Sequence, residues 1–506
     1  MIWSDKQEAI FRLVQEGKRS GLIRARAGTG KTTTIVEAAS RVPPGKSAVC
    51  IAFNKAIATE LAKRLPAHIP AKTFNAFGFR PLMQTLPRTV KLEPRKIQNI
   101  IRDTLTFDAR KIYGGGLRKL VGLAKAHGLV PKDKPAQVTL TPDTEQNWVD
   151  LMERYDIEFE AGGRPLRGIE FAREILTTSI ELAQQGVVID FDDQLYLPVI
   201  WQLPFQQYDR LFVDETQDVN MIQRAIIRMS LKPEGLLYAV GDDAQSIYAF
   251  RGADCDAMEN IKHEFDCVEL PLSISYRCPR RIIELAQAYC PAIEAAPDAP
   301  EGEVIDTIEH NPETFPAGSM VLCRNNAPLV NLAFRLMRHG KPVKMLGRDF
   351  GEGIIRLIEK LGSNDLKQLD RDLDIYAMRE TQALIAKGKE EQADLLNDRV
   401  ETLRVFADNL PESRRTIADL IQYITELFAN ENGRITLSTV HKAKGGEWDT
   451  VFILDSFLMP SKWARQDYQK QQETNLQYVA VTRAKQRLIF INTDDWREQS
   501  TQEARV

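Results

Sequence analysis

The sequence predicts an α/β fold that is built on parallel sheets and interrupted by two helical stretches. Three observations support this prediction. An apolar run at residues 20–24 leads through a glycine-rich turn into a helix-compatible segment at residues 33–39. Further apolar strand candidates, each followed by a polar turn, recur along the chain. Between them, two long stretches combine helical spacing with many charges, which is typical of insertions into a sheet domain.

The turn at residues 25–32 is the first candidate site. Gly28 and Gly30 let the backbone approach a phosphate closely, and the helix that follows adds partial positive charge. Lys31 can reach the outer phosphates, and the Thr32 hydroxyl can hold Mg²⁺. The usual pattern starts with Gly, whereas this chain has Ala25. The segment predicts a phosphate-binding loop formed by Ala27, Gly28, Thr29, Gly30, Lys31, Thr32 and Thr33.

Length and composition are those of a multidomain globular protein. The 506 residues predict three or four domains, and 43% are hydrophobic and 27% charged. The net charge of −3 gives no global basic field, although a basic groove stays possible. The six cysteines form no C-x-x-C pair, so we expect reduced structural thiols. No signal peptide or membrane-spanning run is evident, which predicts a cytoplasmic protein.

The first helix is expected from residue 4 onwards. Ser4 is a candidate N-cap, with Gln7 three residues later as its capping-box partner. The same amide can instead read the edge of an adenine, because it donates and accepts hydrogen bonds at once. The sequence is thus compatible with both roles of Gln7, as a capping-box residue and as an adenine contact.

Two polar–aromatic corners follow the glycine-rich turn. A strand at residues 47–53 turns into a helix at residues 56–65. An exposed Phe53 would stack on a base of single-stranded nucleic acid, with Asn54 and Lys55 beside it for the backbone. A phenylalanine considered alone is more often part of the core. Residues 72–79, which include Thr73, form the second corner.

Residues 80–188 change in character. Basic residues interleave with helical apolar spacing, which predicts a helical insertion with a basic side; an ordinary solvated charged face is the alternative. Gly114 to Gly116 would form a flexible break, and residues 131–135 a linker. The basic residues are Arg95, Lys96, Arg102, Arg110, Lys111, Arg118, Lys119 and Lys125.

The α/β pattern resumes at about residue 190. A strand at residues 210–213 ends in Asp214 and Glu215, where a metal ligand and a base for an attacking water would sit. The next strand, at residues 235–240, leads into a polar segment. There Gln245 would sense a terminal phosphate, while Tyr248 or Phe250 contacts a base.

The C-terminal half contains a second α/β pattern. Residues 291–318 suggest a linker around a strand at 303–305, and a strand at 320–324 and a helix at 329–339 follow. A charged helical stretch occupies residues 352–428. Strands are expected at residues 434–440 and 451–454. A helix from 476 to 487 would carry Arg483, with 19 residues after it.

Taken in order, these segments resemble the UvrD/Rep family of superfamily 1 helicases. The resemblance covers most of the chain outside the two helical stretches. The seven segments are residues 27–32 (motif I), 52–55 (Ia), 213–218 (II), 241–253 (III), 275–277 (IV), 439–448 (V) and 478–484 (VI).

The resemblance implies two RecA-like P-loop domains with parallel sheets and with ATP and Mg²⁺ in the cleft between them. By the family pattern, Gln7 reads adenine, Tyr276 stacks on it and Glu447 contacts the ribose. Arg277 and Arg483 would be arginine fingers. Glu215, Lys31 and Gln245 would complete the catalytic set, and Thr32 and Asp214 would hold the metal. The DNA-binding residues would be Phe53, Asn54, Lys55, Thr73, Tyr248, Phe250 and His441.

The resemblance also implies a four-part organisation. The N-terminal RecA-like domain would comprise residues 1–79 and 189–275, interrupted by the insertion at 80–188. The C-terminal RecA-like domain would comprise residues 276–360 and 429–506, interrupted by a short insertion at 361–428. Three departures from the family stand out: Asn75 replaces the usual His, Gly446 replaces the usual Leu, and the second insertion is reduced.

The expected function is ATP-driven 3′-to-5′ movement on single-stranded DNA with unwinding of duplex, in repair, recombination, replication or phage defence. The expected partners are single-stranded DNA, its junctions with duplex, and a nuclease or repair protein. One alternative is a DNA-binding subunit in which ATP switches a partner nuclease. An inactive paralogue is disfavoured because Lys31, Glu215, Arg277 and Arg483 are present. RNA stays an alternative substrate.

Overall fold

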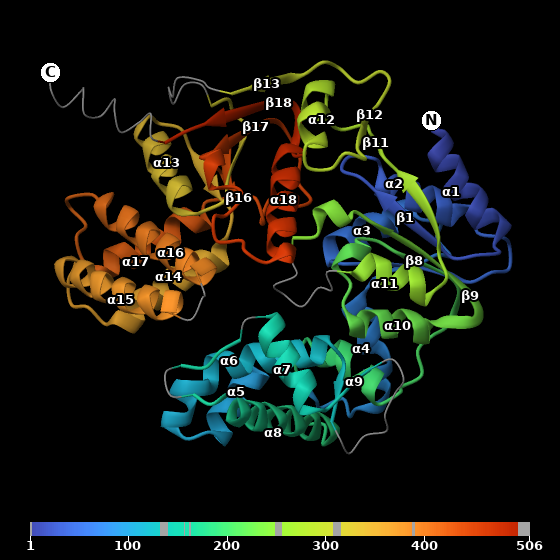
Figure 1. Ribbon diagram of the computed structural model, residues 1–506, viewed down its shortest axis with the longest axis horizontal. Helices are drawn as coiled ribbons and strands as arrows, with labels where there is room; N and C mark the ends of the chain where they lie inside the picture. Colours follow the sequence, from blue (N-terminus) through green and yellow to red (C-terminus); the bar gives the residue numbers. More distant parts are fainter. Residues whose placement is uncertain are drawn as a thin grey trace. The chain divides into compact units, whose positions relative to one another are not determined.

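The protein contains two six-stranded sheets. The computed structural model describes residues 3–131, 140–155, 157–160, 163–247, 256–306, 315–386 and 390–493 (Figure 1). Contacts divide the chain into one unit of Met1–Ala25 with Gly30–Leu272 and a second of Arg26–Thr29 with Ser273–Val506. Each unit holds one of these six-stranded sheets, and the described strands of both sheets pair in parallel. The predicted α/β class is confirmed.

The first sheet places the carboxyl ends of four central strands along one edge. Its order is β10-β1-β9-β8-β2-β3. The predicted strands before the glycine-rich turn, before the first corner and before Asp214 are all present. The bounds are β1 (Gly21–Ala25), β2 (Ala48–Ala52), β3 (Ala71–Thr73), β8 (Tyr208–Val213), β9 (Leu231–Gly241) and β10 (Val268–Leu272). Because parallel strands end at the same edge, the polar residues that follow them gather there.

Helices cover both faces of this sheet. One face packs against the first three helices, through buried residues such as Ile10, Ile35 and Leu61. The other face shares its core with the helical insertion, where Leu22 and Ile51 join Trp148. The helices outside the insertion are α1 (Asp5–Glu16), α2 (Lys31–Ser40), α3 (Lys55–Arg64), α4 (Phe74–Thr85), α9 (Asp193–Ile200), α10 (Met221–Ser230) and α11 (Ala257–Glu264).

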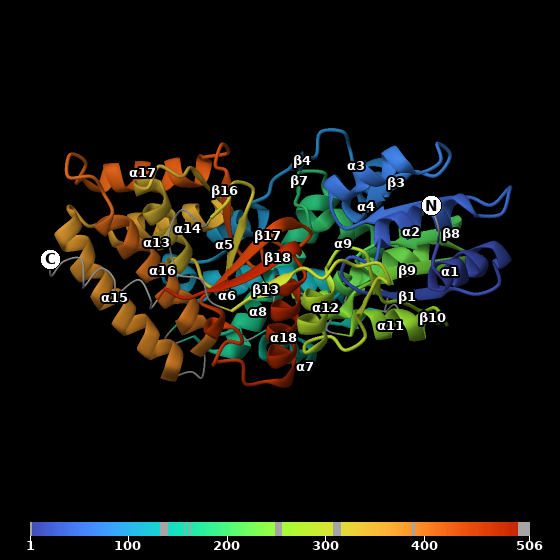
Figure 2. The ribbon, with the colours of Figure 1, turned by 90° about the horizontal axis from the view of Figure 1, so that it is seen from above.

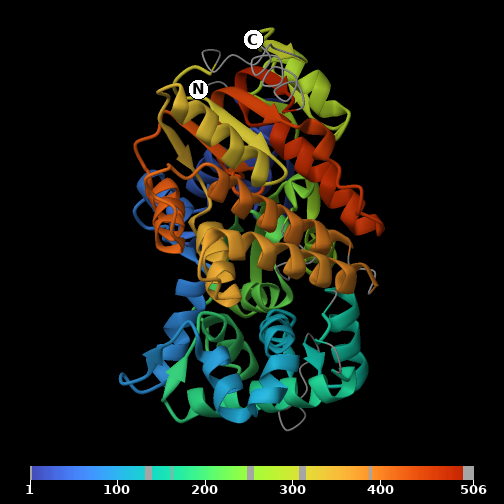
Figure 3. The same cartoon turned by 90° about the vertical axis from the view of Figure 1, so that its left-hand side faces the viewer.

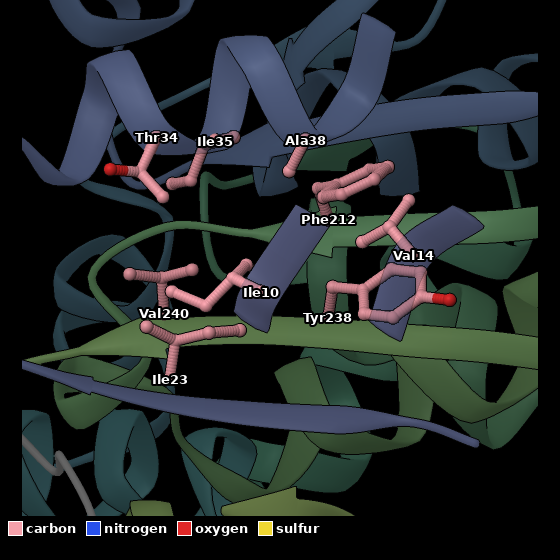
Figure 4. Close-up of a pocket in the computed structure, with 9 residues that line it drawn as sticks. All are labelled: Ile10, Val14, Ile23, Thr34, Ile35, Ala38, Phe212, Tyr238 and Val240. Atoms are coloured by element: carbon pink, nitrogen blue, oxygen red, sulfur yellow. The ribbon is translucent and has the colours of Figure 1, made fainter. Parts of the chain in front are cut away.

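A small gap lies in the core beneath α1 and α2. Its volume is about 10 Å³, which is far below the several hundred Å³ of a ligand pocket. Figure 4 shows side chains from both helices and from β1, β8 and β9 around it. The lining is Ile10, Val14, Ile23, Thr34, Ile35, Ala38, Phe212, Tyr238 and Val240. We interpret it as a packing gap of this core.

The insertion at residues 80–188 is helical, as predicted. Its helices, which lie together in Figure 1, are α5 (Lys96–Thr104), α6 (Phe107–Ala126), α7 (Glu145–Arg154) and α8 (Pro165–Gln184). Two short parallel pairs accompany them: β4 (Lys91–Leu92) with β7 (Val188–Ile189), and β5 (Leu129–Val130) with β6 (Thr141–Pro142). Of the predicted linker, residues 132–135 lie outside the described residues.

The predicted flexible break at Gly114 to Gly116 is wrong. The three glycines lie inside α6, a helix of 20 residues. The buried side chains Tyr113, Leu117 and Leu120 keep one helix face in the core on both sides of the glycines. Packing of this face outweighs the low helix propensity of glycine, which is about 1 kcal/mol per residue.

The predicted basic side is wrong for two of its residues. Lys96 and Lys125 are both 1% exposed. Lys96 Nζ lies 2.6 Å from Asp193 Oδ2, and Lys125 Nζ lies 2.8 Å from Asp190 Oδ2 and from Asp193 Oδ1. These four side chains, here called the buried charge cluster, join α5 and α6 to the start of α9. Their charges are paired because an unpaired buried charge would be very costly.

The second sheet has the order β13-β18-β17-β14-β16-β15. Figure 2 shows β13, β18 and β17 running side by side. The bounds are β13 (Glu303–Ile305), β14 (Met320–Cys323), β15 (Val343–Met345), β16 (Ile435–Thr439), β17 (Trp448–Leu454) and β18 (Ala484–Ile491). A short pair, β11 (Ile274–Ser275) with β12 (Glu294–Ala295), and helices α12 (Arg280–Gln287), α13 (Ala327–Arg338) and α18 (Asp467–Val481) complete this α/β unit.

The predicted helix at residues 476–487 is wrong in its second half. Helix α18 ends at Val481, and β18 starts at Ala484, so Arg483 lies in the connection between them. Leu488, Ile489 and Ile491 are buried in β18, between β13 and β17. The first residues of β18 are mostly polar and, in the sequence, look like a continuation of the helix. The segment nevertheless forms a strand because it pairs with β13 on one side and with β17 on the other.

The charged stretch at residues 352–428 is helical, as predicted, and shares a core with the second sheet. Its helices, orange in Figure 3, are α14 (Arg348–Leu361), α15 (Leu366–Ala386), α16 (Glu390–Asp408) and α17 (Ile417–Ala429). Buried residues of these helices, such as Ile354 and Phe406, form one cluster with Val321 and Leu437 of the sheet. Asp398 of α16 also accepts the Ala327 amide at the start of α13, at 2.9 Å.

Two further expectations concern the state of the cysteines and membrane-spanning segments. The described cysteines, Cys50, Cys267, Cys278, Cys290 and Cys323, are free and buried, which confirms structural thiols at these positions. Cys255 lies outside the described residues. The described helices include none whose length and hydropathy would let it span a bilayer.

Candidate functional site

The glycine-rich turn has the backbone that its sequence predicts. It connects β1 to α2, and both Gly28 and Gly30 adopt positive φ, at 73° and 76°. A Cβ at Gly28 would also lie 2.5 Å from Arg277 Cβ and 2.6 Å from Ser275 Oγ. Glycine is therefore required at position 28 both by its backbone angle and by the space around it.

The tip of the turn, Arg26–Thr29, groups by contacts with the second unit. The Tyr276 amide donates to the Gly28 carbonyl at 2.9 Å. The Ala27 amide donates to the Tyr478 hydroxyl, also at 2.9 Å. Two segments of the second unit, after β11 and within α18, thus fix the conformation of this tip.

Lys31 and Glu215 form an ion pair at the edge of the first sheet. Lys31 Nζ, at the start of α2, lies 3.1 Å from Glu215 Oε1, after β8, and their side chains are 14% and 19% exposed. Burial acts to lower the pKa of Lys31, but the carboxylates of Glu215, Asp242 and Asp214 outweigh it and raise that pKa. The lysine is therefore held charged among three acidic side chains.

The two acidic residues after β8 have distinct environments. Asp214 is 4% exposed, and burial together with the nearby charge of Glu215 raises its pKa to about 7. Glu215 has a left-handed backbone, with φ of 53°. Such a conformation is uncommon for a residue with a side chain and is often found at functional sites.

A hydrogen-bonded chain links Glu215 to Gln245. The Gln217 side-chain amide donates to Glu215, and its Oε1 accepts the Asp242 amide at 2.9 Å. Gln245 Nε2, in the short helical turn η2 (Asp243–Gln245), donates to Asp242 Oδ2 at 2.7 Å. Sequence reasoning gave no role to Gln217 and Asp242, although both stand beside predicted site residues. Their signal is a polar side chain in the segment that follows a buried strand: Asp242 comes directly after β9, and Gln217 comes four residues after β8.

Gln7 is engaged in the capping box that the sequence predicts. Its Oε1 accepts the Ser4 amide at 3.0 Å, and Ser4 Oγ accepts the Gln7 amide at 3.3 Å. Gln7 Nε2 donates to the Thr34 hydroxyl of α2 at 3.1 Å. The capping interpretation is confirmed, and contact with adenine stays a prediction. The hydroxyl of Thr33, one residue before Thr34, accepts a hydrogen bond from Arg64 Nη2 at 2.7 Å.

The first polar–aromatic corner is open to solvent. Phe53 is 41% exposed, so the core interpretation of this side chain is wrong. Asn54 Oδ1 caps α3 by accepting the Ile57 amide at 2.9 Å, and Lys55 is the exposed first residue of that helix. Thr73 caps α4 in the same way, through the Ala76 amide at 3.2 Å. Both caps hold their helix starts in place beside the corner.

Asn75, which departs from the family pattern, bonds to a neighbouring segment. Its Nδ2 donates to the Phe191 carbonyl at 3.1 Å and to Gln194 Oε1 at 3.2 Å. Phe191 is 51% exposed and was missed by sequence reasoning. An aromatic residue within the acidic, polar segment 190–194 was the available signal.

The second unit brings Arg277, Glu447 and Arg483 together. Arg277 Nε lies 2.6 Å from Glu447 Oε2. Arg483 is 1% exposed, and its Nη1 donates to the Gly446 carbonyl at 3.1 Å. Tyr276, in contrast, is 53% exposed.

Position 446 also departs from the family, and the structure gives a reason. A Cβ at Gly446 would lie 2.1 Å from Cη2 of Trp448, so the indole occupies the space of a side chain there. His441 lies in the turn after β16 and is partly buried. Tyr248 and Phe250 lie outside the described residues.

The oxygen donors near Lys31 fit a hard cation that keeps most of its water. Mg²⁺ is usually held by one or two protein oxygens together with phosphate and water. Asp214 and the Thr32 hydroxyl supply this kind of donor. The described residues contain no group of three or more His, Cys, Asp or Glu placed to hold a metal by themselves.

Comparisons with known proteins agree with these motifs. The UvrD/REP helicase N-terminal domain matches residues 3–266, and the UvrD-like helicase C-terminal domain matches residues 356–495. A probable DNA helicase II homologue of Mycoplasma pneumoniae is 25% identical, over 94% of this chain and 82% of that protein. F-box DNA helicase 1 of Gallus gallus is 28% identical over 92% of this chain and 47% of its own length.

One solved structure, an Arterivirus nonstructural protein 10 (helicase) with DNA, aligns with 96% of this chain and 63% of that chain. The TM-score is 0.34 and the identity 11%. The family assignment depends on the sequence matches. Since the N-terminal match alone spans more than half of the chain, the protein belongs to the UvrD/REP helicase family and is a helicase of that type.

Proposed function

We propose that this chain is an ATP-dependent DNA helicase that moves 3′ to 5′ on single-stranded DNA and unwinds duplex. Family membership and the DNA helicase names of its relatives support this proposal. The pathway is repair, recombination, replication or phage defence in a prokaryotic or phage-infected cell. A nuclease or repair protein is the further partner that we propose for this role.

The observation that carries the proposal is the Lys31–Glu215 ion pair of 3.1 Å. Lys31 neutralises Glu215 through this contact. A nucleotide on the glycine-rich turn would attract Lys31 to its outer phosphates. Glu215 would then be released to accept a proton from the attacking water, as a general base must. The pair thus links nucleotide binding to activation of the base.

The other nucleotide residues have complementary roles in this proposal. The turn Ala27–Thr33 would cradle the phosphates, and Thr32 and Asp214 would hold Mg²⁺, which neutralises phosphate charge when bound. Gln245 would report on the terminal phosphate through Asp242 and Gln217. Gln7 and Tyr276 would contact the adenine, and Glu447 the ribose. Arg277 and Arg483 would stabilise charge that develops on the transferred phosphoryl group.

Single-stranded DNA would bind along the polar–aromatic corners of the first unit. Exposed Phe53 offers a ring for base stacking, and Lys55 a charge for phosphate. Phe191, beside Asn75, offers a second exposed ring. Tyr248, Phe250, Thr73 and His441 complete the proposed DNA-binding set.

We also propose that the four-part organisation predicted from the sequence is the functional one. The N-terminal RecA-like domain comprises residues 1–79 and 189–275, with an insertion at 80–188. The C-terminal one comprises residues 276–360 and 429–506, with a reduced insertion at 361–428. Each proposed RecA-like domain contains one of the two six-stranded parallel sheets.

The test measures ATP turnover of the purified protein with and without single-stranded DNA, then unwinding of duplexes that carry a 3′ or a 5′ tail. We expect DNA to stimulate turnover and only the 3′-tailed duplex to be unwound. Unwinding of 5′-tailed duplex alone would overturn the direction. Turnover that does not respond to DNA would overturn the helicase mechanism.

A further inference from the structure

Thr482 contacts both of the proposed catalytic arginines. Arg277 follows β11 and Arg483 follows α18, and the two are far apart in the sequence. Arg277 Nη1 donates to the Thr482 carbonyl at 3.3 Å. Arg483 Nη2 donates to the Thr482 hydroxyl at 3.2 Å. Both guanidinium groups are therefore bonded to acceptors on one residue.

Thr482 is itself held firmly. It is 0% exposed, and its hydroxyl donates to the Tyr478 carbonyl of α18 at 2.8 Å. A hydroxyl has one hydrogen to donate and two lone pairs to accept with. With the hydrogen directed at Tyr478, the lone pairs are available for Arg483. Serine could make the same two bonds, whereas valine could make neither.

The segment before β17 holds the same arginines from another direction. Glu447 pairs with Arg277 at 2.6 Å, and the Gly446 carbonyl accepts from Arg483 at 3.1 Å. The buried Arg483 also donates through Nε to the Val479 carbonyl at 3.0 Å. Because a guanidinium is a planar fork, several acceptors at fixed positions determine its orientation.

We propose that Thr482 is a positioning residue that fixes the spacing and orientation of the Arg277 and Arg483 guanidinium groups. The inference rests on the proposed function, since it assumes that both arginines act on the same phosphoryl group. Displacement of a catalytic group by about 1 Å can lower a rate by about 100-fold. The loss of one hydroxyl is therefore expected to affect the chemical step more than nucleotide binding.

The test compares Thr482→Val with Thr482→Ser in the full chain. We expect Thr482→Val to lower the DNA-stimulated kcat by about 10- to 100-fold, while the Kd of a fluorescent ADP analogue stays within about twofold of wild type. Thr482→Ser, which keeps the hydroxyl, is expected to restore kcat to within about threefold. Thr482→Ala removes the hydroxyl with a smaller side chain and should reproduce the loss.

Thr402→Val is the matched control for stability. Thr402 is also 0% exposed, and its hydroxyl donates to a carbonyl four residues earlier, Asp398, at 2.6 Å. Both valine variants lose one buried hydroxyl-to-carbonyl bond of the same kind, and Thr482→Val also loses the bond from Arg483, so we expect a decrease in thermal midpoint for both. Only the variant at position 482 should lose kcat. Equal kcat losses in the two valine variants would overturn the positioning role.

A double-mutant cycle gives an independent readout. If Thr482 acts through Arg483, then Thr482→Val should change kcat little further in an Arg483→Ala background. Independent, multiplicative losses would contradict the proposal, as would a Thr482→Val enzyme with wild-type kcat. Either result leaves the proposed function intact when wild-type turnover responds to DNA. A wild type without ATP turnover would overturn the proposed function together with this inference.

Discussion

Glu215 is bonded through both carboxylate oxygens, to Lys31 on one side and Gln217 on the other. Both partners hold the carboxylate in one orientation after β8. A proposed general base needs this fixed position, and it also needs the ability to accept a proton. These two requirements can be separated by an isosteric change, because an amide keeps the shape of the side chain and loses its basicity.

Glu215→Gln should therefore keep nucleotide affinity and abolish turnover. We expect a decrease in DNA-stimulated kcat of at least about 100-fold, in line with the loss of a general base. Turnover and binding of a fluorescent ADP analogue are the two measurements. Lys31→Ala is the contrasting variant, expected to lose affinity as well. Near-normal turnover in purified Glu215→Gln would remove this residue from its role.

The exposure of Phe53 leads to a second prediction at this scale. A ring that is 41% exposed can be truncated with little loss of packing. Phe53→Ala should weaken single-stranded DNA binding by about 1–3 kcal/mol, the usual contribution of a base stacked on an aromatic ring. The measurement is the Kd for a labelled oligonucleotide at fixed salt, together with the thermal midpoint.

Phe107→Ala serves as the control for this variant. Phe107 is 74% exposed at the start of α6, away from both polar–aromatic corners in the sequence. We expect its DNA affinity to equal that of wild type. If both variants bind DNA as wild type does, Phe53 has no stacking role.

At the level of elements, the buried charge cluster determines how the insertion is attached. Asp193 accepts from both Lys96 and Lys125, and all three side chains are almost fully buried. The charges of the two lysines keep the pKa of Asp193 low, although burial alone would raise it. Removing the charge of Asp193 leaves Lys96 without this carboxylate partner and leaves Lys125 paired with Asp190.

Asp193→Asn should accordingly destabilise the protein by about 3–5 kcal/mol, the usual cost of breaking a buried ion pair from one side. Chemical or thermal unfolding of the full chain measures this loss. Asp103→Asn is the control, since Asp103 lies exposed on α5 and pairs only at the surface with Arg102. A change at Asp193 as small as that at Asp103 would contradict the structural role of the cluster.

A second charged group connects β1, β10, α11 and η2. Arg24 of β1 pairs with Glu269 at 2.8 Å and with Glu259 at 2.6 Å, and it also pairs with Asp243. Hydrogen bonds from Arg24 and Lys262 lower the pKa of Glu269 to about 2, from an ordinary value of 4.5. The stability that this group contributes is thus complete above about pH 4.5 and is lost as the pH falls towards 2.

Glu269→Gln should lower the thermal midpoint at pH 7 by a small amount, equivalent to at most about 1 kcal/mol for a partly exposed pair. The difference from wild type should shrink as the pH falls from 4.5 towards 2, because the wild-type carboxylate is then protonated as well. Thermal scans of both proteins across this range measure it. A constant difference at every pH would show that the charge of Glu269 is not the cause.

The same elements explain what the sequence could and could not predict. Strands such as β1, β2 and β8 were predictable because each is an apolar run followed at once by polar motif residues. Strand β18 was not, since its first residues, Ala484 to Arg487, are mostly polar and follow a helix directly. The buried lysines were misassigned because their acidic partners lie 97 and 65 residues away in the sequence.

The site shows the same distinction. The identity of residues within a motif, such as Lys31 and Glu215, was predictable because each motif is contiguous. The Arg277–Thr482 bond joins residues 205 positions apart and could only come from the fold. The exposure of Phe53 was also unpredictable, because an aromatic residue after an apolar strand fits a core equally well.

For the whole molecule, nucleotide binding should be visible as stability. A ligand that binds only the folded state at 100 times its Kd stabilises that state by about 2.7 kcal/mol. We expect ADP with Mg²⁺ to raise the thermal midpoint of wild type and to leave that of Lys31→Ala nearly unchanged. Differential scanning fluorimetry over a range of ADP concentrations measures this. Equal shifts in the two proteins would place nucleotide binding elsewhere.

The contact between Gly446 and Trp448 limits which substitutions this protein can accept one at a time. Restoring the leucine that is usual in the family at position 446 would drive its side chain into the indole, 2.1 Å from the new Cβ. The indole would therefore have to move before any side chain could be placed at position 446. A substitution at position 446 is thus best designed together with one at position 448, because the indole of Trp448 fills the space that the new side chain would need.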